Sequence, residues 1–304
     1  MRSNLNSNGA RVRFLRKLYQ WFPFDIRGGL PVDPPREYKP IISCLICASQ
    51  RPRELDELLS DLGRQRIARE KYEVIVLNDG GGEAIRHIVE KYRDRFDLSY
   101  RENDTSRRFI GQLRNATISM SAGQYVLFLD DDTRILQEDF LEKAVALFEK
   151  NSVDIIIPEG RALYGIVKLK HDYFDRYSFG NAGCLYRRNI LDRVGGFRDD
   201  LPSYEDIELG IRLNLIKATM MVTDELVYFH PPFYFPSMQK PISIGKSILK
   251  LRRYYSWPVW LVIFLNALRF LPCGLIPDLR YQQWFKISWG VLLACFKNDK
   301  EYYY

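Results

Sequence analysis

The sequence has few cysteines and no signal segment. Its five cysteines are scattered along 304 residues, and an odd, scattered set argues against a disulfide scaffold and for a reducing compartment. Cys44 and Cys47 have C-x-x-C spacing, but both lie in an apolar strand pattern without a second pair for zinc, so we interpret them as core residues. No apolar secretory stretch follows the polar first ten residues, which favours a cytoplasmic location.

Two common nucleotide-binding motifs and long apolar runs are also missing. The lack of G-x-G-x-x-G after the first predicted strand argues against a dinucleotide-binding fold, and the lack of G-x-x-x-x-G-K-[ST] excludes a P-loop protein. The apolar run between Pro258 and Arg269, and a second run at 284–296, are shorter than the roughly 20 residues of a membrane span. We expect neither to cross a membrane.

The net charge of +7 is unevenly distributed. Residues 1–40 carry eight Lys/Arg and three Asp/Glu, and residues 240–304 carry ten and three, which leaves −5 for residues 41–239. A nucleic-acid-binding protein would carry its positive charge on the binding domain, so no nucleic-acid partner is expected. Basic ends that also contain Trp, Tyr, Phe and Leu are typical of peripheral membrane contact. The alternative is helices packed on the rest of the chain or on a second subunit of a homo-oligomer.

The middle of the chain alternates strand and helix patterns. This alternation predicts an α/β fold with a mostly parallel sheet flanked by helices. The predicted strands are 41–48, 74–77, 98–100, 125–129, 153–157, 161–169 and 220–228, with a loop at 171–181 over the site. We expect a basic extension at 1–38, an α/β domain at 39–239 and a basic, aromatic helical region at 240–304.

Three consecutive acids follow the strand at 125–129. Asp130, Asp131 and Asp132 cannot be buried together without a partner, because clustered carboxylates repel each other. The carboxyl end of a strand is where an open α/β sheet binds its ligand, so a divalent cation with a phosphate beyond it is one interpretation. A solvated turn is the other.

Further polar groups follow neighbouring predicted strands. Their order resembles that of the family 2 glycosyltransferases, which have the Rossmann-like GT-A fold. The residues that carry the resemblance are Ala48, Ser49 and Arg51; Asn78, Asp79, Gly80 and Gly81; Arg114 and Asn115; Asp130, Asp131 and Asp132; and Gly195, Gly196 and Phe197 ahead of Glu205 and Asp206.

The resemblance implies a site for a nucleotide-sugar, expected to be a UDP-sugar, with Mn²⁺ or Mg²⁺. It implies that Asp132 and Asp130 bind the metal, and His230 could complete the metal shell, although a structural histidine is the alternative. The residues implied to contact the nucleotide are Ala48 and Arg51 beside the base, Asp79 at its ring edge, Asp130 or Asp131 at the ribose, and Arg114 with the adjacent Asn115. Arg114 would neutralise phosphate or order the loop. An ordinary surface arginine is the alternative for Arg114.

The resemblance also implies that Asp206 is the general base and that Glu205 orients the acceptor, with inversion at the anomeric carbon. The alternative is that the two acids only cap a helix, for which Ser203 is the predicted N-cap. The Q-x-x-R-W motif of processive members is absent, so we expect a hexosyltransferase that adds one sugar per encounter. A lipid-linked or polysaccharide acceptor fits the basic ends.

Two other functions remain open. A nucleotidyltransferase binds similar ligands but needs a glycine-rich basic loop after the first strand, which the Ser49 to Pro52 turn does not provide. A non-catalytic membrane-associated scaffold could keep the same fold.

Overall fold

The structure is a computed structural model, of which residues 9–31, 40–103, 109–162, 183–231 and 234–296 are described. The predicted loop at 171–181 and most of the predicted strand at 161–169 lie outside these residues. Arg161 and Ala162 form the end of the preceding strand rather than the start of a new one.

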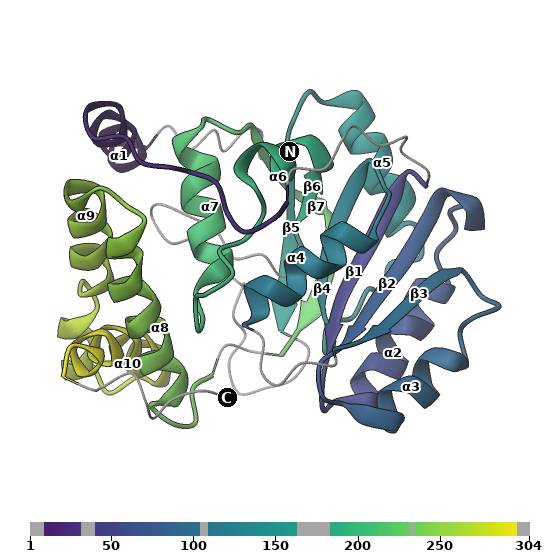
Figure 1. Cartoon of the computed structure of the whole chain (residues 1–304). Coiled ribbons are helices and arrows are strands. Elements are labelled where there is room, and N and C mark those ends of the chain that lie inside the picture. The colour runs from purple at the N-terminus through teal and green to yellow at the C-terminus, as the bar shows by residue number, and fades with distance from the viewer. Residues whose placement is uncertain (1–8, 32–39, 104–108, 163–182, 232–233, 297–304) are drawn as a thin grey trace.

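The described residues form a seven-stranded, mostly parallel sheet in the order β3-β2-β1-β4-β6-β5-β7 (Figure 1). Only β6 runs antiparallel to its neighbours, β4 and β5. The strands are β1 Ile42–Ala48, β2 Tyr72–Asn78, β3 Asp97–Glu102, β4 Tyr125–Asp130, β5 Ile155–Ala162, β6 Leu185–Arg187 and β7 Met220–His230. The predicted fold class is confirmed.

Helices cover both faces of the sheet, which explains why its central strands are apolar on both sides. On one face, alternate β1 residues such as Ile46 pack with α2, α3 and α5. On the other, Leu45 belongs to a cluster with α4, α6 and α7. These helices are α2 Pro52–Gly63, α3 Gly82–Glu90, α4 Ile110–Met120, α5 Phe140–Lys150, α6 Arg188–Val194 and α7 Glu205–Leu215.

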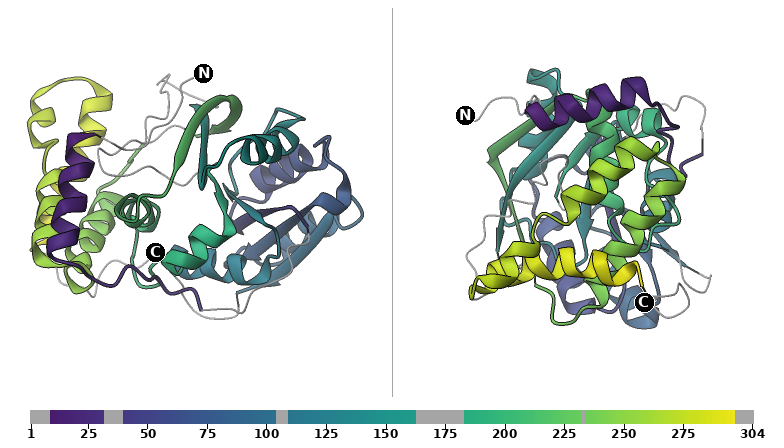
Figure 2. Two further views of the ribbon diagram at one scale, coloured as in Figure 1. Left: turned by 90° about the horizontal axis from the view of Figure 1, so that it is seen from above. Right: turned by 90° about the vertical axis from the view of Figure 1, so that its left-hand side faces the viewer.

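The described helices of the two basic ends pack beside α7, away from the β3 edge of the sheet (Figure 2). The helices there are α1 Ala10–Trp21, α8 Gln239–Lys250, α9 Trp257–Ala267 and α10 Leu279–Ala294, with short 3₁₀ turns η2 Leu251–Arg253 and η3 Leu271–Leu275; another, η1 Arg69–Lys71, precedes β2. Leu15 of α1, Ile211 of α7 and Val259 of α9 share one buried cluster. The predicted boundaries at 38/39 and 239/240 stay predictions.

The segment after α1 is held against the turn that follows α6. Gly28 N–H donates to Val194 O at 2.8 Å, and Leu30 N–H donates to Gly195 O at 2.9 Å. A Cβ on Gly28 would lie 2.4 Å from Gly195 O, so only glycine fits there.

The apolar stretch in the C-terminal region is longer than the sequence pattern indicated, and the expectation that it does not cross a membrane stays a prediction. Within the described residues, the helical stretch Trp257–Leu275 has 19 residues and a mean hydropathy of 1.6, and by length and composition alone it could cross a membrane. The sequence pattern had placed its end at Arg269, but the turn there leads directly into η3, which extends the apolar stretch.

A second correction concerns the start of α7. Its N-cap residue is Tyr204, in the left-handed region at φ 69°, and within the described residues this position has no side-chain capping hydrogen bond. The predicted cap, Ser203, instead donates its backbone N–H to Ser247 Oγ of α8 at 3.0 Å. The acids predicted for the first turn are there, since Glu205, Asp206 and Glu208 begin the helix.

Candidate active site

Three strands end together at one edge of the sheet. Ala48 of β1 lies opposite Asn78 of β2, and Cys47 lies opposite Asp130 of β4. Parallel strands in this register bring their following turns together. The turn at 49–51, the glycine loop after Asn78 and the acid cluster at 130–132 therefore meet, as the sequence predicted.

Asp131 ties the acid cluster to the turn after β1. Its carboxylate accepts hydrogen bonds from Ser49 N at 3.1 Å and from Arg51 Nη1 at 2.8 Å. Burial raises the pKa of Asp131 to about 6, although Arg51 acts in the opposite direction. The described contacts of Asp131 are thus structural, and its predicted ribose contact stays a prediction.

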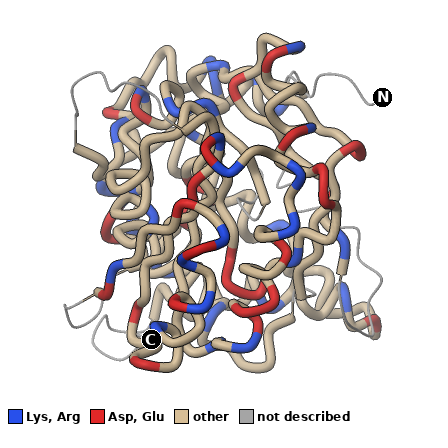
Figure 3. Tube along the Cα trace, turned by 90° about the vertical axis from the view of Figure 1, so that its right-hand side faces the viewer, with Lys and Arg blue, Asp and Glu red and all other residues tan. Residues whose placement is uncertain are grey.

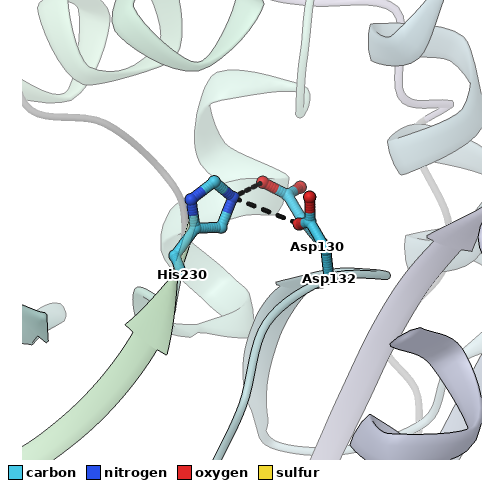
Figure 4. Close-up of side chains that lie close together, drawn as sticks. All are labelled: Asp130, Asp132 and His230. Carbon is cyan, nitrogen blue, oxygen red and sulfur yellow. Dashed lines mark ion pairs between the residues drawn. The ribbon is translucent and has the colours of Figure 1, made fainter. Parts of the chain in front are cut away.

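Asp130, Asp132 and His230 converge on one point (Figure 4). His230 Nε2 lies 3.4 Å from Asp130 Oδ2 and 3.3 Å from Asp132 Oδ1. His230 Nδ1 is 2.8 Å from Pro231 O, and because a carbonyl can only accept, Nδ1 carries a proton and Nε2 is directed to the acids. The three candidate metal ligands from the sequence are therefore brought together.

This cluster fits a divalent cation. Its ligand atoms all lie within 4.8 Å of one another, and neighbouring ligands of an octahedral ion at roughly 2.1 Å are about 3 Å apart. Asp132 Oδ1 is buried and accepts no hydrogen bond from the described residues, although it lies 3.3 Å from His230 Nε2. A buried carboxylate oxygen in that state is a ready metal ligand.

Without a cation, the histidine compensates the two acids. Burial alone would lower the pKa of His230, but its contacts with the carboxylates of Asp130 and Asp132 raise it to about 10. Burial alone would raise the pKa of Asp130, but His230 and Arg114 hold it well below its usual range. A metal ion at this place would compete with the proton on His230 Nε2.

Arg114 joins the acid cluster to the start of α7. Its Nη1 lies 2.9 Å from Glu205 Oε1 and its Nη2 lies 3.2 Å from Asp130 Oδ1. Its side chain is 9% exposed, and the guanidinium lies 5.4 Å from the centre of the Phe197 ring. The surface-arginine alternative is therefore wrong.

Glu205 and Asp206 differ in their contacts. Glu205 is buried against Arg114; burial raises its pKa, while Arg114 lowers it, and the net direction is upward. Asp206 is only partly buried, and its Oδ1 accepts the Ile207 N–H at 2.7 Å. The bond at Asp206 is of the kind expected from an acid at a helix start.

Asn115 contacts the turn at residues 195–199, which follows α6 and which we call the glycine turn. Its described contacts are there rather than at the acid cluster. Its Nδ2 donates to Phe197 O at 2.9 Å and to Asp199 Oδ1 at 2.6 Å, and its Oδ1 accepts from Phe197 N at 2.9 Å. The Gly196 backbone, at φ 61°, passes so close that a Cβ there would lie 2.3 Å from Asn115 Oδ1. The described contacts of Asn115 give it a positioning role.

The loop after β2 is held in part by Asn103, a residue that the sequence did not single out for the site. Asn103, which follows β3, donates its side-chain amide to Asp79. Asn78 donates to Tyr100 Oη at 2.9 Å and accepts from Gly81 N at 2.8 Å. No local pattern marks Asn103, because it reaches Asp79 only through the pairing of β2 with β3.

The contacts of the predicted base-binding residues are also defined. Ala48 is fully buried at the end of β1. Arg51 is half-exposed and donates to Asp132 Oδ2 at 2.6 Å as well as to Asp131. Its described partners are acids, so its predicted contact with a base stays a prediction.

A family model described as "Glycosyl transferase family 2" matches residues 43–198, just over half of the chain. The chain belongs to glycosyl transferase family 2. The match contains Arg51, Arg114 and the acid cluster but ends before Glu205, Asp206 and His230. The family and fold that the sequence motifs indicated are thereby confirmed.

The curated relatives of this family 2 chain are distant. It is 30% identical over 111 residues to the poly(ribitol-phosphate) beta-N-acetylglucosaminyltransferase TarS of Staphylococcus aureus, a match that covers 36% of this chain and 19% of TarS. The chain thus spans about a fifth of the length of that relative.

Solved structures share the fold over more of the chain. Residues 1–349 of S. aureus TarS, in complex with UDP-GlcNAc, match with a TM-score of 0.60 and 20% identity over 84% of this chain and 81% of that one. The mannosyltransferase PcManGT from Pyrobaculum calidifontis, in complex with GDP-Man and Mn²⁺, matches with a TM-score of 0.62 and 19% identity. This match covers 96% of this chain and 97% of PcManGT.

Proposed function

We propose that this protein transfers one sugar from a nucleotide-sugar, most simply a UDP-sugar, to an acceptor hydroxyl with inversion at the anomeric carbon. The observation that carries the proposal is the link made by Arg114, which joins Asp130 of the acid cluster to Glu205 beside Asp206. A diphosphate-binding site and a proton acceptor must lie together in such an enzyme. The TarS structure in complex with UDP-GlcNAc supports the choice of nucleotide.

The proposed metal ligands are Asp130, Asp132 and His230, for Mn²⁺ or Mg²⁺. When bound, the cation would neutralise charge on the departing nucleoside diphosphate. Arg51 holds Asp132 Oδ2, which leaves Oδ1 toward the cluster. Arg114, buried between Asp130 and Glu205, adds a fixed positive charge at the same place.

Asp206 is the proposed general base. Glu205 is buried against Arg114, whereas Asp206 is only partly buried, so Asp206 is the acid that we place against the acceptor. As the acceptor oxygen attacks the anomeric carbon, its proton passes to Asp206 and the bond to the nucleoside diphosphate breaks. Attack from the face opposite the leaving group inverts the anomeric configuration. Glu205 then keeps Arg114, and through it the acid cluster, in place.

The nucleotide would lie over the turns after β1 and β2. Asp79 is the proposed acceptor for the base ring, with Ala48 and Arg51 beside the base and Asp131 near the ribose. The hydrogen bond from Asn103 holds the Asp79 side chain in position. Asn115 acts through the 195–199 turn as a positioning residue.

The acceptor is proposed to be a glycan or a lipid-linked sugar at the cytoplasmic face of a membrane, to which residues 1–38 and 240–304 attach the catalytic domain at 39–239. The basic charge of both end segments supports this location. A single addition per encounter follows from the missing Q-x-x-R-W motif.

The test is a donor screen with the full chain. UDP-, GDP- and dTDP-sugars are each incubated with Mn²⁺ and a mixed extract of glycans and lipid-linked sugars. Nucleoside diphosphate and pyrophosphate are measured separately, and the product linkage is assigned by NMR. We expect UDP from one UDP-sugar and an inverted product. Pyrophosphate release would instead identify a nucleotidyltransferase, and binding of no nucleotide-sugar would leave only the scaffold alternative.

A further inference from the structure

The exposed hydrophobic side chains are concentrated in two segments, 10–22 and 257–296. Of the 13 large hydrophobic residues exposed in the described chain, 11 lie there, and Leu136 and Tyr234 are the other two. The most exposed include Trp21 at 69%, Trp257 at 66% and Leu275 at 88%. Single exposed apolar residues are ordinary, but a concentration of this kind marks an interaction surface.

These segments lie together in space. Helices α1, α9 and α10 are grouped on the side of the molecule away from β3, and both views in Figure 2 show them there. Helix α9 packs against both α1 and α10. We call the exposed sides of α1, α9, η3 and α10 the outer face; it includes Phe14, Trp21, Trp257, Leu265, Leu275 and Trp289.

Helix α9 is apolar on both of its sides. Val259, Ile263 and Ala267, spaced four residues apart, are buried. Trp257 and Leu265 are exposed on the same helix. A helix on the surface of a water-soluble domain normally has a polar outer side. The outer side of α9 therefore fits an apolar partner rather than water.

The charge of these helices indicates which partner. Residues 10–22 and 239–296 contain 12 Lys/Arg and one Asp/Glu. On α1, Arg13 and Lys17 are exposed close to Phe14 and Trp21 in helical spacing, while Val12 and Leu15 are buried. Seen from the opposite side of the molecule, acidic and basic residues are interspersed along the chain (Figure 3).

We propose that the outer face docks on an anionic phospholipid membrane, with α9 lying in the headgroup plane. Exposed Trp and Leu beside Lys and Arg, almost without acids, match the surface of an anionic bilayer, where negatively charged headgroups cover an apolar acyl layer. A second copy of the chain fits less well, because it would place two basic surfaces against each other. The inference extends the membrane location in the proposed function by naming the surface, and the chemistry at Asp206 does not depend on it.

The packing of α9 favours docking over spanning. Val259 and Ile263 belong to the cluster that includes Ile211 and Leu215 of α7. To cross a bilayer, α9 would have to leave this cluster and carry Arg269 into the hydrocarbon layer. Helix α7, which begins with Glu205 and Asp206, lies directly beside this group of helices (Figure 1) and packs against α1. A membrane-anchored acceptor would then be within reach of the site.

The experiment measures co-flotation of the full chain with vesicles of phosphatidylcholine alone or with phosphatidylglycerol added. We expect salt-sensitive binding to the anionic vesicles only. Trp257→Ala with Leu275→Ser should weaken that binding at least about tenfold, since both side chains contribute apolar area. The matched control, Leu136→Ser with Tyr234→Ser, removes the exposed hydrophobic residues outside the outer face and should bind like wild type.

A second pair of variants tests the charge. Arg13→Glu with Lys17→Glu should abolish the preference for anionic vesicles, and the same charge change on α5, Lys143→Glu with Lys150→Glu, should not. UDP binding in the absence of vesicles, measured on each variant, should remain at the wild-type level. This readout separates loss of docking from loss of folding or of the proposed donor site.

Three results would overturn the proposal. One is equal binding to neutral and anionic vesicles. Another is binding that high salt and alkaline washing do not reverse, which would indicate a spanning helix. The third is a wild-type dimer in solution that the Trp257 and Leu275 variant converts to a monomer, which would assign the outer face to a second copy.

Discussion

At the scale of single residues, the two carboxylate oxygens of Asp132 lie in more different environments than those of Asp130 or Asp131. Arg51 binds its Oδ2 at 2.6 Å, while Oδ1 is buried beside His230 and accepts no hydrogen bond from the described residues. When an outer partner holds one oxygen of a carboxylate, the orientation of the other oxygen is fixed, and that oxygen can bind a metal ion. Asp131, by contrast, uses both oxygens on the turn after β1.

The first prediction is that Asp132→Ala weakens Mn²⁺-dependent UDP binding at least about 100-fold, because the loss of a metal ligand exceeds the 10–100-fold effect of losing an outer-shell partner. Calorimetric titration with UDP, with Mn²⁺ or with EDTA, measures it. The control is Asp139→Ala, an acid near α5 that pairs with Lys143. Unchanged Mn²⁺-dependent binding would remove Asp132 from the ligand set.

The second prediction separates the two acids at the start of α7. Asp206→Asn should lower the transfer rate about 10²–10⁴-fold, the range for loss of a general base, with UDP binding unchanged. Glu205→Gln should weaken donor binding as well, because Arg114 loses its ion pair. Transfer rates at saturating donor, with KM for the donor, measure both. A normal rate for Asp206→Asn would exclude it as the base.

The sequence could predict the residues of this site more readily than their contacts. Asp130 and Asp132 follow a strand and are adjacent in the chain, so local pattern suffices. His230 is different, because β7 is separated from β4 by β6 and β5 in the sheet. The bonds from Asn103 to Asp79 and from Arg51 to Asp132 likewise depend on strand order, which no local spacing reports.

At the scale of elements, the strand pattern predicted the sheet well because parallel strands are buried on both faces and read as apolar runs. The start of α7 was less predictable. A serine before an acidic turn normally caps a helix, but Ser203 contacts Ser247 instead, and Tyr204 takes the left-handed conformation. The competing partner comes from α8, more than forty residues later in the chain.

Helix α7 also contains a fully buried ion pair. Glu208 and Arg212 are 0% exposed and are joined by two hydrogen bonds of 2.7 Å. Tyr255 Oη also donates to Glu208, at 3.1 Å. Arg212 donates in addition to Ile26 O, Val194 O and Gly196 O. The pair therefore connects α7 with the segment after α1 and with the glycine turn.

The third prediction concerns this pair. Glu208→Gln should lower the free energy of unfolding by about 3–5 kcal/mol, because it leaves Arg212 as a buried charge without its partner. Tyr255→Phe, which removes one hydrogen bond to the same carboxylate, should cost about 1–2 kcal/mol. Urea unfolding followed by tryptophan fluorescence measures both values. Equal, small losses for the two variants would show that the ion pair does not stabilise α7.

At the scale of the whole molecule, the two ends of the chain complete one core. Leu15 of α1, Ile211 and Leu215 of α7, and Val259 and Ile263 of α9 belong to the same buried cluster. Composition separates the basic ends from the acidic middle of the sequence, and it suggested boundaries at 38/39 and 239/240. It could not show this shared packing, because Leu15 and Ile211 are almost 200 residues apart.

The fourth prediction follows from that cluster. A chain ending at residue 239 loses Val259 and Ile263 from contact with Ile211, and truncation of a buried Leu or Ile to Ala alone costs about 2–5 kcal/mol. Together these losses approach the roughly 5–15 kcal/mol that stabilises a typical domain. We expect fragment 39–239 to be insoluble or to lack near-UV circular dichroism, and the full chain to unfold in one calorimetric transition. A soluble fragment that binds UDP with Mn²⁺ like the full chain would instead show that the catalytic domain is autonomous. The outer helices would then serve attachment alone.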